Sequence, residues 1–231
     1  MKTYSLYYTS SRTNGILTLG NHTDPTVYYC YTKLFTMKPQ IMLREGAGKT
    51  SPMVAFARVQ YLSKHLRIGT GDFEKQPESA LTHEEVRRDH VRLVRSDYEF
   101  DTNIGTNGEK KTYGWARDKT SFTNTVYHCV DEKGDRVASL KSGGMFNFRK
   151  GAEIDIAEGL PKQHEELLIV CALGIWVAEA GWSVFKGYDS HKGGEITAED
   201  PAAQARFSTP EPPPTAQQHD VTAKTNEAHL H

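Results

Sequence analysis

Short runs of β-branched and aromatic residues, separated by turn residues, dominate the chain from residue 4 to residue 156. Residues 27–31 read Val-Tyr-Tyr-Cys-Tyr, for example, and residues of these types are enriched in strands. Many short strands at this spacing predict a β sandwich or a β barrel. We expect strands at 27–31, 40–44, 53–59, 66–69, 91–100, 111–117, 125–131, 137–141 and 145–149.

Turn residues divide these runs. Residues 45–51 form a glycine-rich hairpin connection, Asn107 and Gly108 separate two further runs, and residues 132–135 link the next two as a compact hairpin. One short helix is expected within the β region. Thr82 offers an N-cap hydroxyl and Glu85 follows three residues later, which is the capping-box spacing, so a helical turn through Arg88 is predicted.

A different pattern begins after Pro161. Glu165 and Glu166 are followed by residues 167–178, none of which is polar, so a helix formed there has no polar face. Such a helix belongs either in lipid or at the centre of a protein. The apolar span reaches the lower length limit for crossing a bilayer, but Glu179 falls within it. Because the preceding strands need an apolar partner, we predict that segment 165–185 is a helix buried inside a barrel, and that it is not a transmembrane span.

The chain loses its hydrophobic periodicity after Tyr188. The proline-rich stretch at 209–214 and the polar run to His231 lack the apolar content needed to fold. We interpret the stretch as a spacer. The expected organisation is one β-barrel domain, residues 1–187, with a central helix at about 161–185, followed by a disordered tail containing proline and histidine, residues 188–231.

Composition narrows the functional classes. The 231 residues are 37% hydrophobic and 25% charged, which is ordinary for a globular protein. The formal net charge is −1, so no global excess of basic residues predicts nucleic-acid binding. The three cysteines are odd in number and widely spaced, which excludes a disulfide framework and a paired metal-ligand motif. Residues 1–8 lack an apolar secretory signal. We expect an intracellular, cytoplasmic protein that can associate peripherally with a membrane.

Five segments follow one another along the chain: a hairpin at 41–57, a strand at 113–117, a hairpin at 130–138, a run at 151–156 and the closing helix. Their order resembles the tubby-like superfamily, which includes tubby, the LURP-one-related proteins and the phospholipid scramblases, and it is most similar to uncharacterised fungal members. The resemblance covers about residues 26–187. It implies a closed or nearly closed antiparallel β barrel of about twelve strands around a central C-terminal hydrophobic helix. It implies little about activity, because a fold does not fix a function.

The densest positive cluster surrounds Arg88. Strand alternation splits this cluster between two faces, and Glu84, Glu85 and Asp89 lie close enough in sequence to neutralise it, which favours a solvated surface. The functional alternative is a site for an anionic lipid headgroup, such as a phosphoinositide. Tubby binds phosphoinositides, but none of its binding residues can be matched here. The candidate ligand-binding residues are Lys64, His65, Arg67, Arg87, Arg88 and Arg92.

Other candidate sites lack essential residues. Residues 46–50, Gly-Ala-Gly-Lys-Thr, resemble part of a phosphate-binding loop, but Leu43 replaces its first glycine and strand sequence replaces its helix, so we interpret them as a hairpin turn. His128 and Cys129 are adjacent on a strand and should point to opposite faces, which argues against a nucleophile and base. We predict no catalytic residue, no metal site and no cofactor.

Function therefore stays open among three classes at this stage. The leading hypothesis is a non-enzymatic tubby-like binding module for an anionic lipid headgroup or a protein partner. The alternative is a membrane-associated scramblase-like or lipid-transfer protein, although the chain lacks a palmitoylation-type cysteine cluster and an Asp-rich calcium segment. An enzyme remains the third class, through residues that only the fold brings together. The oligomeric state is left open.

Overall fold

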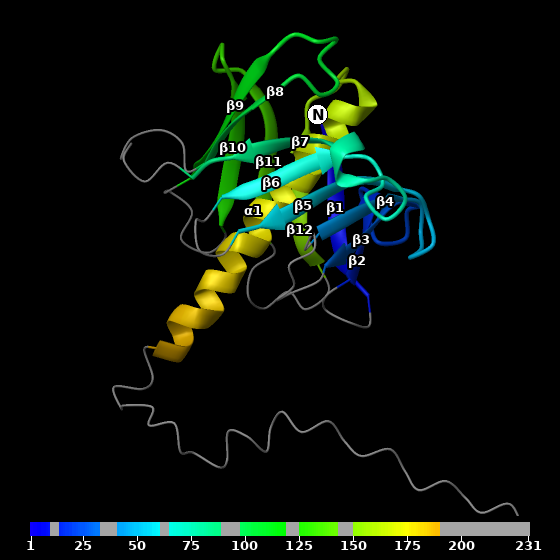
Figure 1. Ribbon diagram of the computed structural model, residues 1–231. Coiled ribbons are helices and arrows are strands. Elements are labelled where there is room, and N and C mark those ends of the chain that lie inside the picture. Colours follow the sequence, from blue (N-terminus) through cyan, green and yellow to red (C-terminus); the bar gives the residue numbers. More distant parts are fainter. Residues whose placement is uncertain are drawn as a thin grey trace, which may run out of the picture. The chain divides into compact units, whose positions relative to one another are not determined.

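The computed structural model describes residues 1–9, 14–32, 41–60, 65–88, 98–118, 125–142 and 150–189, with side chains described as far as Glu179. These residues form a nearly closed barrel of twelve antiparallel strands with one long helix (Figure 1). The predicted fold class is therefore confirmed. The barrel and its helix belong to one compact unit, Met1–Tyr188, and residues 190–231 of the predicted tail lie outside the described part.

The strands follow one another around the barrel in chain order, and the first strand pairs with the last. They are β1 (Lys2–Tyr8), β2 (Asn14–Leu19), β3 (Thr26–Thr32), β4 (Ile41–Glu45), β5 (Met53–Val59), β6 (Leu66–Thr70), β7 (Thr82–Val86), β8 (Tyr98–Thr102), β9 (Lys111–Arg117), β10 (Val126–Asp131), β11 (Arg136–Ser142) and β12 (Lys150–Ile156). The helices are η1 (Glu78–Ala80), a short 3₁₀ turn, and α1 (Lys162–Asp189).

The barrel closes between β7 and β8. There Arg87 and Glu99 form an isolated antiparallel bridge, with N–H···O distances of 2.8 Å in both directions. All other neighbouring strands share four or more paired residues; β1, for instance, pairs with β2 along Tyr4 to Tyr8. The ring of strands is therefore continuous, but fewer backbone hydrogen bonds join β7 to β8 than join any other pair of neighbouring strands.

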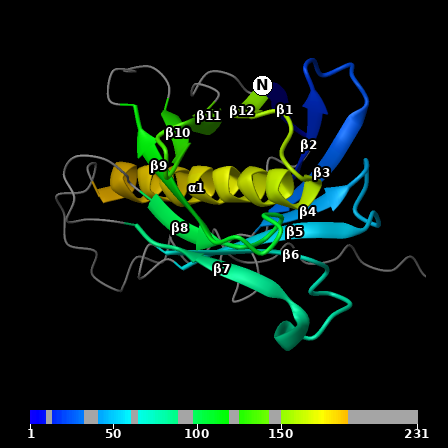
Figure 2. The ribbon, with the colours of Figure 1, turned by 90° about the horizontal axis from the view of Figure 1, so that it is seen from above.

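Helix α1 lies inside the ring, with strands on both sides of it (Figure 2). The side chains of Leu167 and Leu173 are 0% and 1% exposed, and the indole of Trp115 on β9 is equally buried. Gly174 allows the helix to approach the wall, because a Cβ there would lie 3.3 Å from side-chain atoms of Ala57 and Leu66. The predicted burial is confirmed as far as Ala178, with Trp176 half-buried. Across the described residues, no helix combines the length and the sustained hydropathy that crossing a bilayer requires.

Two carboxylates of α1, those of Glu165 and Glu179, have partners on the barrel wall. Near its start, Glu165 accepts hydrogen bonds from Lys2 and from the hydroxyl of Tyr4. Further along, Glu179 accepts a hydrogen bond of 2.8 Å from the hydroxyl of Tyr98 and lies 3.3 Å from a guanidinium nitrogen of Arg88. The charge that weakens the segment as a membrane span is thus a paired residue at the barrel wall.

Most predicted strands are confirmed within one or two residues at each end, but the predicted helical turn at 82–88 is wrong. Thr82–Val86 is strand β7, which pairs along its whole length with β6 and buries Val86. The hydrogen bonds of this ladder outweigh a local capping pattern, because isolated helical turns are marginal without tertiary support. Sequence analysis did not delimit β1 and β2. The parts of the expected strands at 91–97 and 145–149 lie outside the described residues.

Candidate functional site

Two rows of side chains face outward from β5, β6 and β7. Arg58 on β5 lies directly opposite Arg67 on β6. In the next outward row, Phe56 on β5 lies opposite Gly69, which lies opposite His83 on β7. Because alternate residues of a strand share a face, the two rows are neighbours on the outside of the barrel. The strand register thus places two guanidinium groups beside an aromatic ring.

Gly69 leaves the space that the Phe56 ring fills. A Cβ at position 69 would lie 2.7 Å from Cζ of Phe56, closer than side-chain contacts allow. The Phe56 ring meets Phe73 edge-on, with ring centroids 5.5 Å apart, and Leu81 packs against the same group. Phe73 and Leu81 belong to the connection from β6 to β7. This connection therefore folds back over the outside of the barrel and forms a second, smaller apolar cluster.

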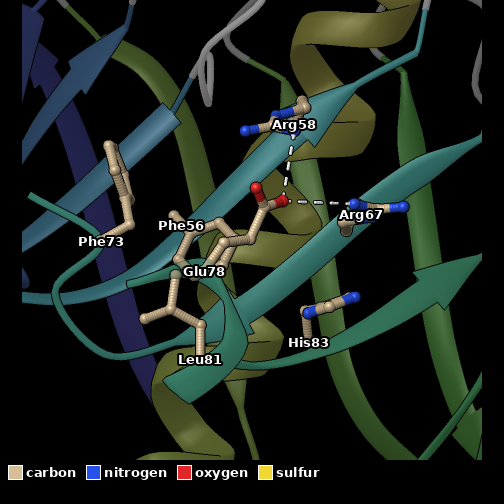
Figure 3. Close-up of a pocket in the computed structure, with 7 residues that line it drawn as sticks. All are labelled: Phe56, Arg58, Arg67, Phe73, Glu78, Leu81 and His83. Carbon is tan, nitrogen blue, oxygen red and sulfur yellow. Dashed lines mark ion pairs between the residues drawn. The ribbon is translucent and has the colours of Figure 1, made fainter. Parts of the chain in front are cut away.

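A pocket of about 110 Å³ lies between this apolar cluster and the two arginines (Figure 3). Glu78, the first residue of η1, extends its carboxylate between them. One carboxylate oxygen is 3.8 Å from Nη1 of Arg58 and 3.6 Å from Nη1 of Arg67, as the dashed lines in Figure 3 show. We call this the arginine pocket. Its lining residues are Phe56, Arg58, Arg67, Phe73, Glu78, Leu81 and His83.

The arginine pocket carries more positive than negative charge. Two guanidinium groups face one carboxylate, and like charges directly opposite each other on neighbouring strands destabilise a sheet. The Nε atom of Arg58 is buried and has no hydrogen-bond partner among the described residues. An anion with several acceptor oxygens fits such a site, because it can accept hydrogen bonds from both guanidinium groups at once.

The predicted ligand-binding residues do not form one cluster. Arg67 lines the arginine pocket, whereas His65, Arg87 and Arg88 line a groove of about 650 Å³ beside the bridge that closes the barrel. Lys64 and Arg92 lie outside the described residues. Arg88 is also committed to the barrel, since it pairs with Glu179 and lies 5.6 Å from the ring centroid of Tyr98.

The groove offers little preference for an anion. Beside its three permanent cations, Arg87, Arg88 and Lys110, it holds four carboxylates, of Glu84, Glu85, Glu99 and Asp101. The Lys110 ammonium lies 2.8 Å from Asp101, and hydrogen bonds from Lys110 and Thr112 lower the pKa of that carboxyl. Of the acidic residues expected to neutralise this surface, Glu84 and Glu85 line the groove, and Asp89 lies outside the described residues. The arginine pocket is the better candidate for an anion.

His128 and Cys129, the pair considered for catalysis, point to opposite faces of β10, as strand alternation predicts. Cys129 is fully buried in the core, whereas His128 is partly exposed on the other face, 3.8 Å from Asp118. Burial raises the pKa of Cys129 well above its usual value and that of Cys30 to about 12, so both thiols stay protonated at neutral pH. Within the described ranges, no three histidine, cysteine or carboxylate side chains form a metal-binding group. The glycine-rich residues 46–50 connect β4 to β5, as predicted for a hairpin turn.

No family model, curated protein or solved structure matches the chain. The membership of the tubby-like superfamily therefore stays a prediction, while the helix-centred barrel that it implied is present. Sequence analysis named Arg67 but missed Arg58, Glu78 and His83. Alternation along 53–59 could have placed Arg58 on the outer face, but its pairing with Arg67 depends on the register between two strands.

Proposed function

We propose that the chain is a non-enzymatic binding module of the tubby-like type, which holds the phosphate of an anionic phospholipid headgroup in the arginine pocket. The observation that carries this proposal is the pairing of Arg58 and Arg67 on facing strand positions, with an Nε–H on Arg58 that has no partner in the part of the chain that the structure describes. Guanidinium groups bind phosphate through several parallel hydrogen bonds, and two of them together match a phosphate with three free oxygens.

The size of the pocket agrees with a headgroup. A volume of about 110 Å³ is well below the roughly 300 to 1,000 Å³ of sites that enclose a whole small molecule. It can hold one phosphate and the atoms next to it. A lipid headgroup needs no more, because the rest of the lipid stays in the bilayer while the barrel rests on its surface.

The filled interior of the barrel favours binding of a lipid headgroup at the protein surface rather than transport of a whole lipid. Lipid transfer requires room for an acyl chain, but α1 fills the axis of the barrel, and its residues from Leu167 to Ala172 are all 0% exposed. An acyl chain would have to displace this helix, and with it the apolar contacts that stabilise the fold. The scramblase-like and lipid-transfer alternatives therefore rank below a headgroup-binding module.

Binding to vesicles tests the proposal. We expect the full chain to sediment with vesicles that contain phosphoinositides in phosphatidylcholine, and not with phosphatidylcholine alone. Arg58→Gln and Arg67→Gln should each weaken this binding about tenfold, because each removes charge-assisted hydrogen bonds to the phosphate. Arg136→Gln is the matched control, since Arg136 is exposed on β11 and changes the net charge equally. Equal losses in all three variants would show that general charge attracts the protein, and would reject the pocket.

A protein partner is the second candidate, and the apolar cluster beside the arginines favours it. Phe56, Phe73 and Leu81 offer an apolar wall next to two guanidinium groups, which suits an acidic peptide with an apolar side chain. The same vesicle experiment separates the two candidates. Absence of wild-type binding to phosphoinositide vesicles rejects the headgroup and leaves the peptide as the ligand class to examine.

A further inference from the structure

Asparagine is followed by glycine at two places in the chain, Asn14-Gly15 and Asn107-Gly108. In such a pair the backbone nitrogen of the glycine can attack the side-chain amide carbon of the asparagine, because glycine has no side chain to shield that nitrogen. The structure places the first pair in a strand of the barrel wall and the second in an exposed turn. We propose that Asn107 is a site of spontaneous modification in the folded protein, where it is converted to aspartate and isoaspartate, and that the fold protects Asn14.

The reaction at Asn107 needs no partner other than water. The backbone nitrogen of Gly108 forms a bond to Cγ of Asn107 and loses its proton, and the side-chain nitrogen leaves as ammonia, so that a cyclic imide results. Water then opens the imide at either of its carbonyl carbons. One opening leaves aspartate, and the other leaves isoaspartate, in which the main chain runs through the side-chain carbon. No electrons are transferred, and each event replaces a neutral amide by a carboxylate.

The turn that contains Asn107 lies at the tip of the connection from β8 to β9. The Glu109 amide donates to the carbonyl of Thr106 at 3.2 Å, and the Thr106 hydroxyl donates to the carbonyl of Glu109. Asn107 and Gly108 are exposed and have φ angles of 55° and 83°. A Cβ at position 108 would meet no other atom within 4 Å, and in the described part of the structure the Asn107 side chain makes no hydrogen bond. Both reacting groups are therefore in water, and two hydrogen bonds close the turn around them.

The start of this connection is fixed to α1, so the tip can change while the fold stays intact. Ile104 is 6% exposed, and its carbonyl accepts a hydrogen bond of 3.0 Å from Nδ1 of His164. A Cβ at Gly105 would lie 2.7 Å from the backbone nitrogen of His164, so the loop backbone lies directly on the first turn of the helix. These contacts do not involve Asn107. The modified protein should therefore stay folded and accumulate.

Asn14 is held much more firmly. It is 8% exposed and begins β2, where it lies opposite Tyr31 of β3. Gly15 is paired on both sides, with Tyr8 of β1 and with Cys30 of β3. Formation of the imide turns the glycine nitrogen toward the asparagine side chain and so breaks this pairing. Local opening of a strand between two neighbours is much rarer than opening of a loop tip, so the same dipeptide should react slowly here.

Mass spectrometry of aged protein measures the two sites separately. The full chain is incubated at neutral pH and digested with trypsin, which releases Asn14 in peptide 13–33 and Asn107 in peptide 96–110. In the folded protein we expect Asn107 to be converted at least about tenfold faster than Asn14, because the loop tip opens more often than the strand. In urea that unfolds the chain, the two rates should agree within about twofold, since the fold then protects neither site.

Asn103 supplies the matched control in the same connection. It is also exposed, but it precedes Ile104, whose branched side chain shields the backbone nitrogen. Asn107→Gln should remove most of the acidic form that isoelectric focusing resolves in aged protein, whereas Asn103→Gln should leave it unchanged. An isoaspartyl carboxyl methyltransferase, supplied with S-adenosylmethionine, should label aged wild type more strongly than aged Asn107→Gln. Thermal melting checks that both variants fold, and we expect melting temperatures close to wild type because both positions are exposed.

Several results would overturn the inference. Equal conversion of Asn107 and Asn14 in the folded protein is one, because the fold would then protect neither site. Another is an intact Asn107 in folded protein under conditions in which the unfolded chain reacts at both sites. An undiminished acidic form in Asn107→Gln also contradicts the proposal, and loss of the thermal transition on conversion contradicts the expected accumulation. None of these results depends on the arginine pocket, because Asn107 does not line it.

Discussion

Arg87 and Glu99 exchange both of their backbone hydrogen bonds, at 2.8 Å each, and through this pair β7 meets β8. Among the described residues it is the only bridge between these two strands. The other neighbouring strands are joined along most of their lengths, so the barrel should open first at this position. Local opening is expected where backbone hydrogen bonds are few and exposed to solvent.

We expect Glu99→Pro to destabilise the protein by about 3 kcal/mol, because proline has no N–H to donate to the carbonyl of Arg87. Glu99→Ala keeps that donor and, at an exposed position, should change stability by less than about 0.5 kcal/mol. Urea denaturation measures both. Similar unfolding free energies for the two variants would contradict a structural role for the bridge. Fast hydrogen exchange at the Arg87 amide, relative to amides in β1, is the matching observation in the wild type.

The pair formed by Arg88 and Glu179 should contribute to stability. Arg88→Gln leaves the Glu179 carboxylate, which is 20% exposed, with the Tyr98 hydroxyl as its remaining partner in the described structure. Loss of a charged partner at a largely buried group costs about 1 to 3 kcal/mol. The double variant Arg88→Gln, Glu179→Gln should recover part of this loss, since no unpaired charge remains. A double-mutant cycle by urea denaturation measures the coupling, and additive losses would mean that the pair does not interact.

The ion pair between Arg88 and Glu179 also makes charge reversal at Arg88 a poor test of lipid binding by the positive cluster around this residue. Reversal of the charge at Arg88 would place a second carboxylate beside Glu179, so lost lipid binding could reflect an unfolded barrel. Arg67 and Arg58 avoid this problem, because each forms an ion pair with the exposed carboxylate of Glu78 on the outside of the barrel.

Leu173→Asp should unfold the domain. Leu173 is 1% exposed inside the barrel, and an unpaired carboxylate buried there costs several kcal/mol against a typical total of about 5 to 15. Gln163→Asp introduces the same side chain at an exposed position in the first turn of α1, where a negative charge is tolerated or favourable. Circular dichroism and thermal melting measure the difference. A Leu173→Asp protein that melts like the wild type would contradict the central position of α1.

Stability should depend on pH through Glu166. Burial raises the pKa of this carboxyl to about 7, so the folded protein holds a proton that the unfolded chain releases above its ordinary carboxyl pKa. The folded state therefore loses stability as the pH rises from about 4.5 to 7. Glu166→Gln is neutral throughout, so its stability relative to wild type should increase over this window by an amount on the order of 3 kcal/mol.

The effect of Glu166 has to be measured as the difference between the variant and the wild type, because His164 also makes stability depend on pH. Burial lowers the pKa of His164, so the folded protein binds fewer protons there than the unfolded chain, and its contribution to stability rises as the pH increases toward 6.5. The two groups act in opposite directions in wild type. Subtraction of the wild-type curve from the Glu166→Gln curve removes the effect of His164. A difference that stays constant between pH 4.5 and pH 7 would contradict the raised pKa of Glu166.

The sequence predicts the elements of this fold better than their pairing. Runs such as residues 53–59 reveal a strand because branched and aromatic residues favour extended backbone, and the uninterrupted apolar run from Leu167 reveals a helix that needs burial on all sides. The helical turn predicted from the capping pattern at Thr82 is wrong, because that pattern reflects only a local preference, whereas β7 forms through hydrogen bonds to β6.

The candidate site depends on relationships that a single sequence does not contain. Arg58 and Arg67 meet only because β5 and β6 pair in one register, and a shift by one residue would turn one of them inward. Glu78 meets both because the following connection folds back over the barrel. Likewise, the sequence shows a charged residue, Glu179, in an apolar helix, where its burial costs free energy. It does not show that the ion-pair partner is Arg88, which lies far away in the sequence, just after β7.

The position of α1 after all twelve strands has a consequence for how the protein is made. Strand β1 must wait for its partner β12, and the inward side chains of every strand must wait for the helix that covers them. Until the ribosome has released residues 162–179, the nascent sheet has an apolar face without a core. Long-range β pairing is slow, and exposed sheet faces aggregate. We therefore expect synthesis of this protein to depend on chaperones that hold an incomplete barrel open until α1 has been made.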